Sequence, residues 1–115
     1  MTHAKDLTKE APRSPYIRIE GFSLLARAID KGRATLAHTN GDYRFKCPLD
    51  RMLFAFAKVK AHDFEERLKE GLSDHQIGEW VKKESKLSDE EIKEWSDSIE
   101  GQFDHVIEDD LESFA

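Results

Sequence analysis

The sequence predicts a mainly α-helical protein: a compact bundle of five or six short helices with a small β-hairpin near residues 34–47. A nine-residue pattern that occurs twice and several segments with apolar residues at helical spacing predict the helices. The dipeptide Asn40–Gly41, between two alternating segments, predicts the hairpin. At 115 residues the chain is long enough for one hydrophobic core and too short for two domains.

The N-terminal residues 1–15 are expected to form an extended arm, and residues 16–115 a single helical domain. Pro12 and Pro15 disfavour helix in the residues that precede them. A first helix is predicted from Phe22 to Lys31, because its apolar residues share one face, and Gly32 is expected to end it.

The segment that follows this helix does not keep the helical period. With Asn40 and Gly41 as a two-residue turn, its apolar and polar residues separate onto opposite faces. The residues expected to face each other are Leu36 and Phe45, His38 and Tyr43, and Ala34 and Cys47. We therefore expect a hairpin with one buried face that is covered by helices.

The remaining helices are predicted from their start signals. Pro48 suits the first position of a helix, and a short helix is expected to start near Asp63. The pattern LSDxxIxEW then occurs at Leu72–Trp80 and again at Leu87–Trp95. Each copy has serine at the N-cap position and Gln or Glu three residues later, which indicates a capping box. A last amphipathic helix is predicted from Phe103 to Phe114.

Charge is distributed unevenly along the chain. Residues 1–87 contain 17 Lys and Arg against 13 Asp and Glu, whereas residues 88–115 contain one Lys and 11 acidic residues. The acidic end can pack against the basic part, or each part can face a different partner. Nucleic-acid binding is disfavoured because an acidic surface repels phosphate groups.

The sequence also bears on the cellular compartment. No apolar run reaches the roughly 18–20 residues that span a bilayer, so no membrane segment is expected. Residues 1–14 lack the apolar stretch of a signal peptide. The single cysteine, Cys47, excludes an internal disulfide, and these features together favour a cytoplasmic location.

Several runs of residues resemble a family of small bacterial proteins that is catalogued only as a domain of unknown function. They are PRSP at Pro12–Pro15, AIDKGRATLA at Ala28–Ala37, NGDYRFKCPLD at Asn40–Asp50 and IxEWS at Ile92–Ser96. The resemblance implies a bacterial cytoplasmic protein with a helical fold, and it implies no activity, substrate or cofactor. The chain departs from the family pattern at His38, where the resemblance implies glycine.

The leading functional hypothesis is a non-catalytic binding or interaction module whose partner is a protein or a small anionic ligand. Six of its arginines lie between residues 13 and 51, and the planar guanidinium group suits carboxylate or phosphate. The candidate binding residues are Arg33, His38, Tyr43, Cys47, Asp50 and Arg51. The structural alternative is that these arginines pair with the chain's own acids.

The alternative function is a small enzyme or ligand-binding protein with a pocket where the hairpin meets the next helix. Cys47 precedes a predicted helix, whose dipole favours a thiolate. The expected strand register places His38 roughly 13 Å along the strand, too far to act as its base, although His62 could approach from another helix. We therefore expect a structural cysteine and no cofactor. No metal is expected either, because the helix face with His105, Glu108 and Asp109 could give a metal only two ligands, and a site needs three or four. A third hypothesis is self-association through Phe103–Phe114.

Overall fold

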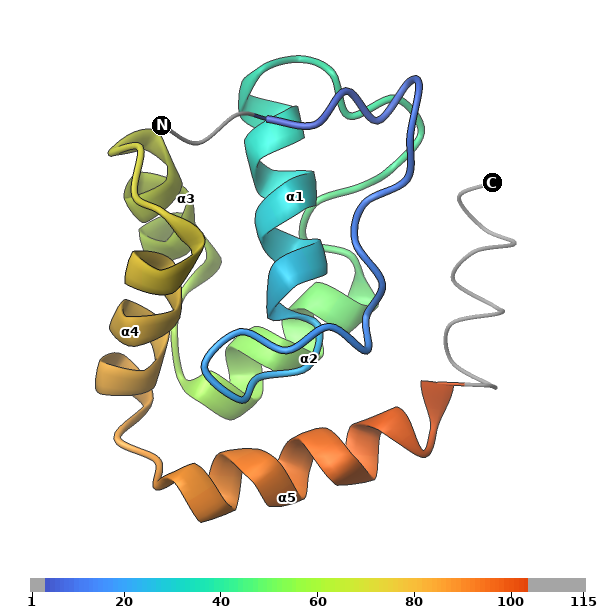
Figure 1. Ribbon diagram of the computed structural model, residues 1–115. Helices are drawn as coiled ribbons and strands as arrows, with labels where there is room; N and C mark the ends of the chain where they lie inside the picture. The colour runs from blue at the N-terminus through green and yellow to red at the C-terminus, as the bar shows by residue number, and fades with distance from the viewer. Residues whose placement is uncertain (1–3, 104–115) are drawn as a thin grey trace.

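The computed structural model describes residues 4–103, which form five α-helices around one core (Figure 1). The helices are α1 (Leu25–Leu36), α2 (Pro48–Ala57), α3 (Ala61–Lys69), α4 (Asp74–Ser85) and α5 (Asp89–Glu100). The predicted mainly helical class is confirmed for this part of the chain. The predicted helix at Phe103–Phe114 lies outside the described residues except for Phe103. No helix among residues 4–103 is long and apolar enough to cross a membrane.

The core is centred on α1, which contacts α2, α3 and α4. Residues 25–32 of α1 are all buried, charged ones included. Around α1, aromatic rings join the other helices: the Phe54 and Phe64 ring centroids lie 4.9 Å apart, and Phe56 stacks on Trp95 at 4.4 Å. The second contact fixes α5 to α2, so that α5 runs along one end of the molecule (Figure 1).

Both copies of the repeated pattern start helices, as predicted. The Ser73 hydroxyl accepts a hydrogen bond from the Gln76 N–H at 3.2 Å, and the Ser88 hydroxyl accepts one from the Glu91 N–H at 3.1 Å. The side chains of Gln76 and Glu91 accept in return from the two serine N–H groups. Each cap of this kind contributes about 1 kcal/mol. The starts of α4 and α5 are therefore set locally.

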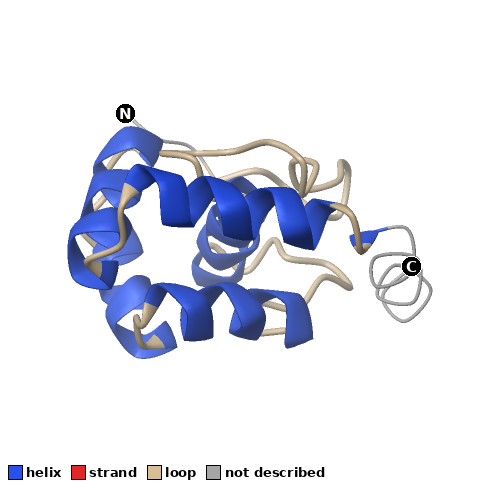
Figure 2. Ribbon diagram, turned by 90° about the horizontal axis from the view of Figure 1, so that it is seen from below, coloured by secondary structure: helices blue, strands red, loops and turns tan. Residues whose placement is uncertain are grey.

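The β-hairpin predicted near residues 34–47 is not formed. α1 continues to Leu36, and residues 37–47 form a loop that contains no strand (Figure 2). Asn40 and Gly41 do lie in a turn, in which the Tyr43 N–H donates to the Asn40 carbonyl at 3.0 Å. The backbone of this loop forms a hydrogen bond with the N-terminal segment instead of with a partner strand: the Leu7 N–H donates to the Thr39 carbonyl at 2.7 Å.

Gly32 does not end α1, contrary to the prediction. The glycine instead allows close packing against α1. A Cβ at this position would clash with Leu68 Cδ1 and lie 3.3 Å from the Phe45 ring. The missing side chain therefore lets α3 and the loop approach α1. The helix ends in a Schellman motif, in which the Thr39 N–H donates to the Ala34 carbonyl at 2.8 Å and the His38 N–H to the Thr35 carbonyl at 3.2 Å.

A two-residue turn with positive φ does occur, but at Glu20 and Gly21. Their φ values are 51° and 86°, and Ile19 and Phe22 exchange both backbone hydrogen bonds across the turn. These features are typical of a type I′ turn. The Ser96 hydroxyl of α5 donates to the Gly21 carbonyl at 2.6 Å. The predicted helix start at Phe22 is therefore wrong, and α1 begins at Leu25.

The end of α1 gives a first prediction. His38 has a φ of 60°, a left-handed conformation that glycine adopts with least strain. We expect His38→Gly to raise the free energy of unfolding, measured by urea denaturation, by up to about 1 kcal/mol. His38→Ala removes the imidazole and keeps the Cβ, so it is the matched control and should not stabilise. Equal stabilisation by both changes would assign the cost to the imidazole and not to φ.

Candidate functional site

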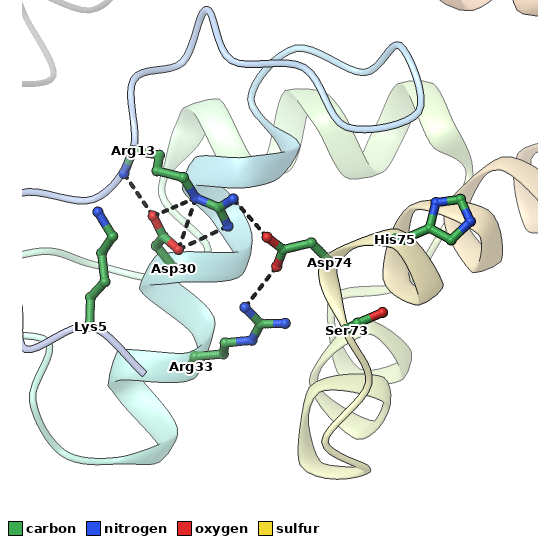
Figure 3. A pocket seen from close by; sticks show the side chains of 7 residues that line it. All are labelled: Lys5, Arg13, Asp30, Arg33, Ser73, Asp74 and His75. Carbon is green, nitrogen blue, oxygen red and sulfur yellow. Dashed lines mark hydrogen bonds and ion pairs between the residues drawn. The ribbon is translucent and has the colours of Figure 1, made fainter. Parts of the chain in front are cut away.

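A cavity of about 500 Å³ lies between the N-terminal segment, α1 and the start of α4 (Figure 3). The residues that line it are Lys5, Arg13, Asp30, Arg33, Ser73, Asp74 and His75. Three of these side chains are cationic and two are carboxylates, and they come from parts of the chain that are far apart in sequence. The cavity is therefore a charged site that only the folded chain assembles.

Asp74 joins two arginines in this cavity. Arg13 Nη1 donates to Asp74 Oδ2 at 2.7 Å, and Arg33 Nη1 donates to Asp74 Oδ1 at 2.8 Å (Figure 3). Arg33 Nη2 also donates to the Leu72 carbonyl at 2.9 Å. Because Asp74 directly follows the N-cap Ser73, the local start of α4 decides where its carboxylate lies. One carboxylate thus links the N-terminal segment, α1 and α4.

Asp30 holds Arg13 from the other side. The Asp30 side chain is only 5% exposed. Its carboxylate accepts from the Arg13 backbone N–H at 2.7 Å and from Arg13 Nη2 at 3.0 Å. Arg18 is paired as well, with Asp97 at 2.7 Å and Glu100 at 2.8 Å. Arg13, Arg18 and Arg33 therefore pair with the chain's own acids, as the structural alternative expects.

The two arginines keep Asp74 ionised. Burial raises the pKa of a carboxylic acid, but hydrogen bonds and charges from Arg13 and Arg33 outweigh burial and lower the pKa of Asp74 below its ordinary value. Burial likewise opposes the charge on Arg13, yet its bonds to Asp30 and Asp74 raise the pKa of Arg13. Asp74 and Arg13 therefore attract each other as charged groups at neutral pH.

A second charged cluster is buried between α1, the loop and the start of α2. Lys31 Nζ lies 3.0 Å from Cys47 Sγ and 3.1 Å from Asp50 Oδ2. Lys31 is 1% exposed and Asp50 2%. The Asp50 carboxylate also accepts the backbone N–H groups of Lys46 and Cys47 at 2.9 and 3.3 Å. This cluster fixes the loop to α1, and it leaves Cys47 as a structural residue at the start of α2.

The structure brings only two of the six predicted binding residues together. Cys47 and Asp50 share the buried cluster, and Arg33 lines the cavity. The half-buried Tyr43 lies against Arg27, whose guanidinium carbon is 5.8 Å from the ring centroid. The other two are exposed, His38 at the end of α1 and Arg51 on α2.

Arg13 was one of the six arginines behind the binding hypothesis, but three other residues that organise these clusters were not predicted, namely Asp30, Lys31 and Asp74. One sequence signal could have indicated two of them. Asp30 and Lys31 lie within a helix whose other residues are largely apolar, and a buried charge needs a partner. Their partners could not be named, because Asp50 and Arg13 are brought near only by folding.

Comparison of the sequence with known protein families identifies the family of this chain. The model of the domain of unknown function DUF5069 matches residues 9–110. The chain belongs to this family. The DUF5069 match includes both charged clusters, with Lys5 alone outside it. No curated protein matches the chain with significance.

The thiol gives a second prediction. Burial and the charge of Asp50 raise the pKa of Cys47, although Lys31 opposes them, and the residue is only 4% exposed. We expect iodoacetamide to alkylate native Cys47 far more slowly than the same residue in urea, because little thiolate is present and access is poor. A native rate equal to the unfolded rate, with an apparent pKa below the ordinary thiol value, would restore a nucleophilic role.

A third prediction concerns acid stability. Because the pKa of Asp74 is lowered in the folded state, its stabilising contribution is full above the unfolded value, about pH 4, and is lost as pH falls through the folded value. We expect Asp74→Asn to lower the free energy of unfolding at pH 7 by on the order of 1 kcal/mol. Below about pH 4, the free energy of unfolding of Asp74→Asn should also fall less steeply with decreasing pH than that of wild type. Asp42→Asn, an exposed change in the loop, is the control. Equal acid slopes for wild type and Asp74→Asn would contradict this account.

Proposed function

We propose that this protein is a non-catalytic binding module of the bacterial cytoplasm, whose ligand is a small anion with carboxylate or phosphate groups. The cavity in Figure 3 is the proposed binding site, with Arg33 as its main contact. One observation carries the proposal: Arg33 lines the cavity and has more N–H donors than it has hydrogen bonds to the described protein. A guanidinium group has five N–H donors, and within residues 4–103 the hydrogen bonds of Arg33 go only to Asp74 and Leu72.

The charge of the cavity supports an anionic ligand. Three cationic and two acidic side chains line it, which leaves a formal excess of one positive charge. The start of α4 adds to this, because the N-terminal turn of a helix carries a partial positive charge. A volume of about 500 Å³ is also within the usual range for small-ligand pockets.

The alternative function, a small enzyme, has weaker support. A thiol enzyme needs an accessible thiolate and a base within hydrogen-bond distance. Cys47 is buried and its pKa is raised, so it is a poor nucleophile. In the cavity, Asp74 is held ionised by two arginines, and its lowered pKa makes it a weak base. These charges favour holding an anion over moving a proton.

The fourth prediction tests anion binding directly. Inorganic phosphate and succinate are titrated separately into the full chain by calorimetry, with thermal shift as a second readout. We expect wild type to bind at least one of them, with an affinity that falls as ionic strength rises. Arg33→Gln should weaken binding about tenfold or more, because it removes a charged fork from the cavity.

Arg51→Gln is the matched control, since it removes an exposed arginine on α2 and should leave binding unchanged. Circular dichroism checks that both variants keep the helical fold. Equal binding by the two variants would reject the cavity as the site. Absence of any heat and any thermal shift from both anions would reject the small-anion ligand.

A further inference from the structure

A second cavity, of about 490 Å³, adjoins the proposed binding site at Arg33, which lines both. Residues close together in sequence line the two cavities on either side of this arginine. On the N-terminal segment, Lys5 lines the first cavity and the adjacent Ala4 the second. After α3, Ser73 lines the first cavity and Gly71, two residues earlier, lines the second. The two cavities therefore lie side by side, with Arg33 between them.

The second cavity is mostly apolar. Besides Arg33 and Lys69, the described residues that line it are Ala4, Leu36, Ala37, Leu68 and Gly71, and none of these carries a carboxylate. Leu36 is 36% exposed, which leaves apolar surface in contact with water. A Cβ at Gly71 would meet no atom within 4 Å, so there is room at this edge. Lys69 is exposed and pairs with Glu66 at 3.3 Å, so Arg33 is the cation best placed between the two cavities.

The helical spacing of α1 connects the charged and the apolar parts. Leu36 and Ala37 follow Arg33 by three and four residues, and residues at this spacing lie on one face of a helix. A ligand whose charged end binds Arg33 can therefore extend along the same face of α1 towards Leu36 and Ala37. Apolar groups gain free energy on leaving water for such a surface, in proportion to the area buried.

We propose that the ligand of Arg33 is an amphipathic monocarboxylate, with an unbranched alkyl chain that lies in the second cavity. This inference rests on the proposed function, because it keeps the anionic group at Arg33 and adds the chain. The Nη atoms of Arg33 donate to Asp74 and to the Leu72 carbonyl, whereas its Nε–H has no acceptor within residues 4–103. The guanidinium group is thus held in place and still has donors for a carboxylate.

The charge of the first cavity favours a carboxylate over a phosphate ester. The side chains that line it have a formal excess of one positive charge, which a single carboxylate neutralises. A phosphate monoester carries about −1.5 to −2 at neutral pH. Its additional charge would be repelled by Asp30 and Asp74, which line the same cavity.

The fifth prediction uses butanoate, hexanoate and octanoate, titrated separately into the full chain by calorimetry at constant ionic strength. We expect each step of two CH2 groups to lower the Kd about five- to tenfold, because burying one CH2 group strengthens binding roughly three- to fourfold. Octanamide has a chain of the same length without the charge and should bind at least about tenfold more weakly than octanoate. Octyl phosphate should bind no more tightly than octanoate.

Two variants locate the chain and the charged group. Leu36→Gln makes the cavity wall polar at similar side-chain length, so the ratio of the butanoate Kd to the octanoate Kd should fall several-fold. Met52→Gln is the matched control, since Met52 lies on α2, is also 36% exposed and lines neither cavity. It should keep the wild-type ratio. Arg33→Gln should weaken octanoate binding about tenfold or more. Circular dichroism checks the fold, and Ala37→Gln replaces Leu36→Gln if the latter does not fold.

Failure of this inference and failure of the proposed function give different results. If phosphate or succinate binds through Arg33 but the Kd is constant along the carboxylate series, the alkyl chain is rejected and the small-anion site stands. A dependence on chain length that is unchanged in Leu36→Gln, or that persists without Arg33 and with octanamide, also overturns the inference. Tighter binding of octyl phosphate than of octanoate would reject the carboxylate. If no anion binds at all, both the inference and the proposed function are rejected.

Discussion

The pairing of charges on a buried helix determines how this protein is assembled. α1 carries Asp30, Lys31 and Arg33 within a stretch that is mostly out of solvent, and an unpaired ion there would cost several kcal/mol. Each of these three charges meets its partner on a different part of the chain. Asp30 binds the N-terminal segment, Lys31 binds the loop and the start of α2, and Arg33 binds the start of α4. The neighbours of α1 are therefore selected by charge as well as by shape.

Local and tertiary interactions support each other at α4. The capping box at Ser73 sets the first residue of the helix, which is Asp74, and this carboxylate then meets two arginines from earlier parts of the chain. These ion pairs are partly buried, and an ion pair of this kind is weak evidence for stability compared with an apolar contact. Its directional bonds nevertheless specify one arrangement of α1, α4 and the N-terminal segment. The same bonds leave donors of Arg33 at the cavity, so the structural cluster and the proposed binding site share their residues.

The sequence predicted helix boundaries correctly where they depend on neighbouring residues, and incorrectly where they depend on contacts between distant parts of the chain. The caps at Ser73 and Ser88 and the position of Pro48 are local, and all three helix starts were predicted. The end of α1 was not predicted correctly. Gly32 was taken as a helix stop, but it is needed for the close contact with Leu68, and the sequence does not show that these two residues meet. Of the predicted binding residues, Arg33 lines the cavity, whereas Cys47 and Asp50 lie in the buried cluster, and the sequence did not indicate that Asp74 and Lys31 would be their partners. Those partners lie 41 residues away in the case of Asp74, and 16 residues from Cys47 in the case of Lys31.

The N-terminal segment has a particular consequence for the order in which the chain folds during synthesis. Arg13 bonds to Asp74, 61 residues later, and Arg18 bonds to Glu100, 82 residues later, so this segment leaves the ribosome well before these partners. Contacts that are so distant in sequence form slowly and late. The N-terminal segment therefore stays without these partners until residues 74–100 have emerged, and until then it is exposed to proteases and chaperones in the nascent chain.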